Sequence, residues 1–134
     1  MSMPASSESQ VGHRLELVLQ SMAEKIQRAH PAMTFAVHHG QNEDFPWWVV
    51  ARFTHGEPVA KSVDVSIECQ RRNGLLRLRA DIARENGYVV SEYPAAEYSG
   101  TENEESVACW LGERLNQIEE FLHEQIQTIT QELA

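Results

Sequence analysis

Residues 61–84 read KSVDVSIECQRRNGLLRLRADIAR, and this stretch decides the fold class. From Lys61 to Arg72 apolar and polar residues alternate, which is the pattern of a half-buried β-strand. Asn73 and Gly74 separate this run from a second alternating run, and both residues tolerate the positive φ angles of a two-residue type I′ turn. The stretch therefore predicts an antiparallel hairpin.

The side chains of this hairpin indicate its register. A two-residue loop places Ile67 opposite Ala80 on one face and Glu68 opposite Arg79 on the other. Apolar pairs and opposite charges are the cross-strand neighbours that stabilise sheets. A three-residue loop would set Ile67 against Arg79, because a slip of one residue turns every side chain to the wrong face. We therefore predict the two-residue loop.

Further strands are expected before and after this hairpin. Alternation over residues 33–39 and 47–54 predicts two strands, with Trp47 facing the core and Trp48 facing the other side. Asn86-Gly87 predicts another hairpin, into residues 88–93, and Pro94 is expected to limit that strand.

The register of the second hairpin is less clear from its side chains. A two-residue loop would set Asp81 opposite Glu92, which is unfavourable because both are acidic. A three-residue loop with a glycine bulge pairs Asp81 with Ser91 and Ile82 with Val90 instead. We predict the bulged version.

Two helices are expected at the ends of the chain. Residues 9–30 carry apolar side chains at spacings of three and four, which predicts a helix that ends before Pro31. Residues 104–133 predict one helix, capped by Thr101 or Asn103, whose apolar side chains repeat after eleven residues and so form a nearly straight stripe. That helix would be roughly 40 Å long, whereas the strands reach about 17–27 Å. Its last turns are therefore expected to overhang the sheet.

These elements predict an α+β fold, a two-layer α/β sandwich. An antiparallel meander sheet of about five strands is flanked by an N-terminal and a long C-terminal helix, in the order α-β-β-β-β-β-α. A length of 134 residues favours one domain. We assign that domain to residues 9–134 and a disordered lead to residues 1–8, which are rich in serine and have little to bury.

The net charge of −9 is unevenly distributed. Acidic and basic residues balance up to Ser91, whereas from Glu92 onward there are ten acidic residues and one basic residue, Arg114. Such a field repels nucleic acid and anionic membranes, so we expect neither as a partner, and it attracts a basic protein. The alternative is that the acidic surface only keeps the protein in solution.

The compartment is predicted from the cysteines and the N-terminus. Residues 1–10 lack the basic-then-apolar order of a signal peptide, and no apolar run approaches the length that spans a bilayer. Cys69 and Cys109, without a secretory signal, favour a reducing compartment, so a cytoplasmic location is expected.

No catalytic motif is present, and we expect neither a metal nor a cofactor. His38 and His39 are adjacent on a strand and point to opposite faces. His38 and His55 could meet across one sheet face, and the alternative is that both are solvated. The acidic stretch 97–105 lacks the alternating ligands of a calcium loop. The glycines are scattered singly, so they form no phosphate-binding loop.

Two surfaces are candidates for binding a partner. The first is the predicted open face of the sheet, where tryptophan and arginine, residue types enriched at binding hot spots, gather. Its candidate residues are Trp48, Val50, Arg52, Arg77 and Arg79, interleaved with Asp64, Glu68 and Asp81. The alternative for this face is a solvated sheet with salt-bridged arginines. The second is the overhanging helix end, with Ile126 and Ile129 rimmed by Glu119 and Glu120, which we expect the first helix or a second copy of the chain to cover.

No motif in the sequence assigns the chain to a family. Its element order resembles the frataxin-like layout, and its size and acidity resemble those of type III secretion chaperones. By analogy with small acidic α+β domains of chaperones and immunity proteins, we predict a non-enzymatic protein-binding domain that shields a basic partner, as a homodimer. The alternative is a small enzyme or metal-binding protein that uses histidines and carboxylates in a cleft beside the sheet.

Overall fold

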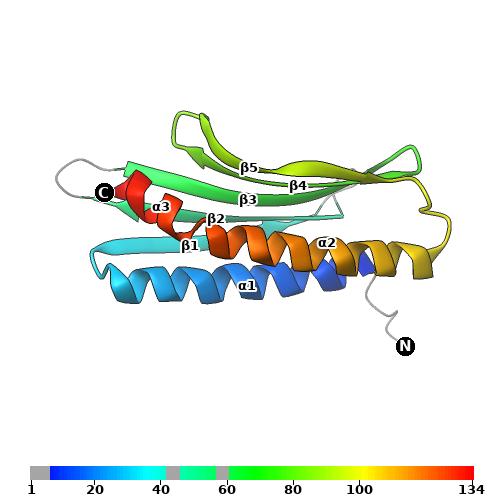
Figure 1. Ribbon diagram of the computed structural model, residues 1–134, viewed down its shortest axis with the longest axis horizontal. Helices are drawn as coiled ribbons and strands as arrows, with labels where there is room; N and C mark the ends of the chain where they lie inside the picture. Colours follow the sequence, from blue (N-terminus) through cyan, green and yellow to red (C-terminus); the bar gives the residue numbers. More distant parts are fainter. Residues whose placement is uncertain (1–6, 42–45, 57–60) are drawn as a thin grey trace.

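The computed structural model describes residues 7–41, 46–56 and 61–134, which form one antiparallel sheet and a layer of helices (Figure 1). The elements are α1 (Ser7–Ala29), β1 (Met33–Gly40), β2 (Trp47–His55), β3 (Lys61–Arg72), β4 (Leu75–Arg84), β5 (Val89–Tyr98), α2 (Glu104–Glu124) and α3 (Ile126–Leu133). The strands are neighbours in sequence order, so the sheet is a five-stranded meander. The predicted α+β class and element order are confirmed.

The core lies between the helices and one face of the sheet. Alternate residues of β2, β3 and β4 are buried, as the period of two in a strand requires. The largest fully buried side chains are Leu15, Leu19, Met22, Ile26, Phe53, Ile67, Leu76, Leu78, Ile82, Leu111, Ile118 and Leu122. Leu17 is exposed, as its place opposite the apolar stripe of α1 predicts. Among the described helices, none is both long and apolar enough to cross a bilayer.

The register predicted for the hairpin of β3 and β4 is confirmed. Ile67 lies opposite Ala80 and Glu68 opposite Arg79. Asn73 and Gly74 have φ angles of 53° and 75°, the positive values that a type I′ turn needs at both central positions.

The register predicted for the second hairpin holds only next to the turn, where the N–H group of Arg84 donates to the carbonyl of Tyr88 at 2.8 Å across a three-residue loop and Gly87 has a φ of 88°. Further along the strands the predicted register is wrong. Asp81 lies opposite Glu92 and Ile82 opposite Ser91, with a register shift between Ile82 and Ala83. The two facing carboxylates are tolerated because Arg79, on the same strand and face, donates from Nη2 to Oδ2 of Asp81 at 3.3 Å.

Strand β5 also runs further than predicted, since it continues through Pro94 to Tyr98. Pro94 falls where β4 and β5 shift register between Leu78 and Ala80, and β5 is an outer strand. Bulges and outer strands are the places where a sheet tolerates a residue without an N–H group.

The C-terminal helix is bent at Gln125 into α2 and α3, so the prediction of one uninterrupted helix is wrong. α2 begins after Asn103, whose side chain accepts hydrogen bonds from the N–H groups of Glu105 and Ser106, and it ends at Glu124, with Gln125 as its C-cap. Gln125 has a ψ of −4°, and its N–H donates to the carbonyl of Leu122, three residues back, at 3.1 Å. This tight turn redirects the helix axis before α3 begins.

The bend also overturns the expected overhang. In α3, Ile129 is 0% exposed and Leu133 is 1% exposed, and the helix packs against β3, α1 and α2. His55 Nδ1 lies 3.1 Å from the carbonyl oxygen of Leu133, and Lys61 Nζ donates to that of Ala134 at 2.7 Å. The chain thus covers its own apolar helix end.

Candidate functional site

The face of the sheet opposite the helices gathers the side chains that the sequence predicted there. Along β2 the residues facing the core are buried, whereas Trp48 and Val50 are half-buried and Arg52 is exposed. Arg77 and Arg79 on β4 are exposed in the same way. We call the surface of these five residues, with Asp64, Glu68, Asp81 and Glu97, the open face.

Each arginine of the open face lies beside a carboxylate. Arg52 donates from Nε and Nη2 to Asp64 at 2.8 and 3.0 Å. Arg79 Nε lies 3.0 Å from Glu68, and Arg77 Nε lies 3.7 Å from Glu97. The hydrogen bond and charge of Asp64 raise the pKa of Arg52. These cations are therefore already neutralised within the chain.

Trp48 is the large aromatic residue of the open face. Its Cα partners are Gly40 on β1 and Glu68 on β3. A Cβ atom at Gly40 would lie 2.5 Å from Cζ2 of Trp48, which is closer than real Cβ contacts. Glycine at position 40 thus lets the indole ring lie flat against the end of β1 and leaves its outer side accessible.

The second predicted binding surface, at the end of the C-terminal helix, does not form an exposed patch. Ile129 is buried, Ile126 is half-buried, and Glu119 forms an ion pair with Arg14 of α1 at 3.3 Å. Glu120 is exposed on α2. Because α2 and α3 lie in the helix layer, these residues are separated from the open face by the sheet (Figure 1).

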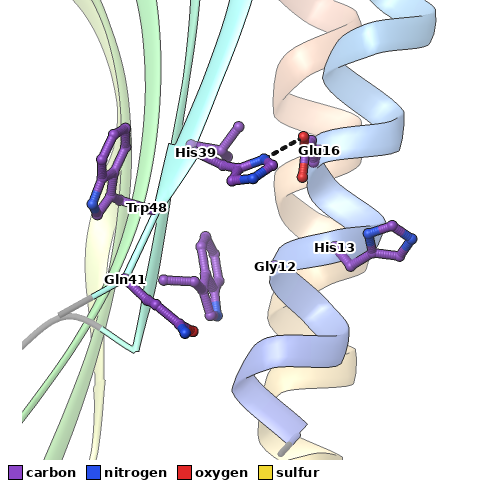
Figure 2. A pocket seen from close by; sticks show the side chains of 9 residues that line it. Gly12, His13, Glu16, His39, Gln41 and Trp48 are labelled. Atoms are coloured by element: carbon purple, nitrogen blue, oxygen red, sulfur yellow. Dashed lines mark hydrogen bonds and ion pairs between the residues drawn. The ribbon is translucent and has the colours of Figure 1, made fainter. Parts of the chain in front are cut away.

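The structure reveals a hollow between α1 and the ends of β1 and β2, which sequence reasoning missed. Its volume is about 350 Å³. The lining residues are Gly12, His13, Glu16, His39, Gly40, Gln41, Trp47, Trp48 and Val49. Figure 2 shows Glu16 and His39 between α1 and β1, with Trp48 on the far side of β1.

Glu16 and His39 link the walls of this hollow. His39 Nδ1 lies 2.5 Å from Oε1 of Glu16, and the two residues are 23 positions apart in the chain. Alternation along β1 puts His39 on the helix side, but no spacing in the sequence indicates its partner. The buried indole N–H of Trp47 has no hydrogen-bond partner among the described residues.

The two histidines that the alternative prediction would place in one cleft, His38 and His55, are not brought together. His38 lies beside Val50 on the open face, whereas His55 lies on the other face and binds α3. Within residues 7–41, 46–56 and 61–134, no three His, Cys, Asp or Glu side chains form a group that could hold a metal ion. Cys69 is buried and Cys109 is exposed.

Comparisons of the chain with protein-family models, with curated proteins and with solved structures gave no match. Arguments about its function therefore rest on the site itself.

Proposed function

We propose that this chain is a non-enzymatic protein-binding domain and that its open face is the docking surface. The observation that carries the proposal is the half-buried pair Trp48 and Val50 on a sheet face that no described helix covers. Tryptophan and arginine supply much of the energy of protein interfaces, because they combine a large contact area with fixed hydrogen-bond geometry.

The ion pairs of the open face favour a protein partner over nucleic acid. Binding to phosphates requires cations that are free to replace counterions. Here the described arginines Arg52, Arg77 and Arg79 are each paired with a carboxylate. Asp81 adds a further negative charge beside Arg79. The partner we propose is therefore a protein with an apolar patch bordered by basic residues.

The experiment is photo-crosslinking in the cells that make the protein, with a crosslinking amino acid at position 77 of the open face. The matched control carries it at position 17, because Leu17 is 57% exposed on α1 in the other layer. We expect a crosslinked protein from position 77 only, and its yield should fall when Trp48 is replaced by alanine. No crosslink at position 77, or equal yields with and without Trp48→Ala, would overturn the proposal.

A further inference from the structure

The two outer strands of the sheet differ in how their free edges are protected. β5 contains Pro94, carries Glu92 and Glu97, and pairs with β4 through two register shifts. Proline, charges and bulges are the means by which natural sheets prevent edge-to-edge pairing. β1 reads MTFAVHHG, without proline, Asp, Glu, Lys or Arg, and it pairs with β2 over eight residues without a shift.

The hairpin of β3 and β4 fixes which main-chain groups of β1 face outward. A two-residue turn closes on a hydrogen-bonded pair, here Arg72 and Leu75, and bonded pairs alternate with non-bonded pairs along an antiparallel ladder. Within a strand, successive residues direct their main-chain groups toward the two neighbouring strands in turn. When this alternation is followed from β4 through β3 and β2 to β1, the N–H and C=O groups of Phe35, Val37 and His39 point away from β2.

The hydrogen bonds of Met33 independently indicate that the same set of main-chain groups points outward. Its N–H donates to the carbonyl of His30 at 2.9 Å, and its C=O accepts from the side chain of Gln27 at 3.2 Å. Both groups therefore bond outside the sheet, and residues two, four and six positions later face the same way. At the start of β1 the outward groups are satisfied by His30 and by Gln27 of α1, whereas no described residue is seen to bond the outward groups in the middle of the strand.

We propose that β1 pairs antiparallel with β1 of a second copy of this chain, about a two-fold axis at Val37. In this register Val37 lies opposite its own copy, and Phe35 lies opposite His39 of the second copy. All of these residues turn their main-chain groups outward, so each pair exchanges both of its hydrogen bonds.

The second copy fits because the edge is self-complementary. A two-fold axis presents the same surface twice, and the absence of charged residues from β1 means that the two strands do not repel each other. Phe35 and Val37 are half-buried on the helix side, so pairing would cover more of their apolar surface.

The position of α1 also permits the pairing. α1 packs against both β1 and β2, so the two copies of α1 would lie side by side about 10 Å apart, within the usual range for packed helices. Glu16 and Gln27 both reach β1. At helical spacing, the row from Glu16 to Gln27 also includes the half-buried Gln20, which donates to the exposed Glu24, and Ala23, which is buried in the core. The side of α1 toward the second copy therefore carries amides, together with Glu24 and with Glu16, which His39 already binds.

This pairing goes beyond the proposed function and does not depend on it. Two five-stranded sheets would join edge to edge and present their open faces as one continuous surface of ten strands. A partner protein could then contact residues of both copies.

The first test is sedimentation equilibrium of the full chain over a range of concentrations. We expect the mass of two chains, and the mass of one chain for Ala36→Lys, which sets two lysines close together across the axis. Ala95→Lys, at an alanine of β5 that is also exposed, is the control and should remain dimeric. A monomeric wild type, or equal masses for the two lysine variants, would overturn the proposal.

The second test locates the axis. Opposed residues of a bonded pair have Cα atoms about 5.5 Å apart, inside the range that a disulfide spans. In a Cys109→Ala background, Val37→Cys should give a covalent dimer on mild oxidation, whereas Ala95→Cys should not. Crosslinking at position 95 but not at position 37 would contradict the β1 pairing, and the Ala36→Lys result decides the matter if Val37→Cys does not fold.

Discussion

Arg84 at the end of β4 and Glu132 in α3 form a two-bond ion pair, 48 residues apart in the chain. Arg84 Nε donates to Oε2 of Glu132 at 2.7 Å, and Nη2 donates to Oε1 at 3.2 Å. Side-by-side bonds of this kind are the strongest arrangement of arginine with carboxylate. The pair therefore holds the last helical turn beneath the sheet, against the end of β4.

This ion pair should make stability depend on pH. The hydrogen bond from Arg84 lowers the pKa of Glu132 below its ordinary value of 4.5, and the charge of Lys61 lowers it further. A carboxyl whose pKa is lower in the folded state stabilises the fold above its unfolded pKa and loses that contribution as pH falls through its folded pKa. Glu132→Gln should therefore lower the thermal midpoint at neutral pH, with the difference vanishing well below pH 4.5.

Glu120→Gln is the control for this prediction, because Glu120 is exposed on α2. It should leave the midpoint nearly unchanged across the same pH range. If Glu132→Gln lowers the thermal midpoint by the same amount in acid as at neutral pH, packing and not the ion pair is responsible.

Ile67 and Glu68 are neighbours in sequence that face opposite sides of β3. Ile67 is 0% exposed, so Ile67→Asp should destabilise the fold by several kcal/mol, since it buries a carboxyl group without a partner. Glu68→Ala should cost less than about 1 kcal/mol, as the loss of an exposed ion pair with Arg79 does. Chemical denaturation measures both changes, and equal losses would contradict the assignment of faces.

Gly12 in α1 should resist replacement although helices usually favour alanine over glycine. A Cβ atom at position 12 would lie 2.6 Å from Cγ of the buried Trp47. Gly12→Ala should therefore destabilise by about 1–3 kcal/mol, the usual cost of overpacking a core.

Gly112 in α2 is the matched control, since a Cβ atom there would meet nothing within 4 Å. Gly112→Ala should stabilise the fold by roughly 0.5–1 kcal/mol through helix propensity alone. Urea unfolding of both variants checks the pair, and stabilisation by Gly12→Ala would show that Trp47 moves aside at little cost.

Ile129 should behave as a core residue of a single chain. Ile129→Ala is expected to cost about 2–5 kcal/mol, as truncation of a buried isoleucine does, without changing the mass in sedimentation. Gln127→Ala, at an exposed position of the same helix, should have little effect. If Ile129→Ala changed the mass, this helix end would be a contact between chains, as the sequence predicted.

The candidate site was predictable only in part. Alternation along β2 and β4 placed Trp48, Arg52 and Arg79 on one face, because a strand turns successive side chains to opposite sides. Glu97 was missed, since Pro94 suggested that the strand had already ended, and its contact with Arg77 depends on the extended β5. The Glu16 and His39 contact was missed because neither spacing nor composition relates a helix to a strand that follows it.

The sequence by itself determined the element order and the register of β3 with β4. Alternation and the Asn73-Gly74 turn are local signals, and one residue of slip would have buried Arg79 or exposed Ile67. Only the tertiary structure decided the register of β5 and the bend at Gln125. There the competing local arrangements differ little in energy, so distant contacts select between them: Arg79 offsets the facing Asp81 and Glu92, and His55, Lys61 and Arg84 hold α3 beneath β3.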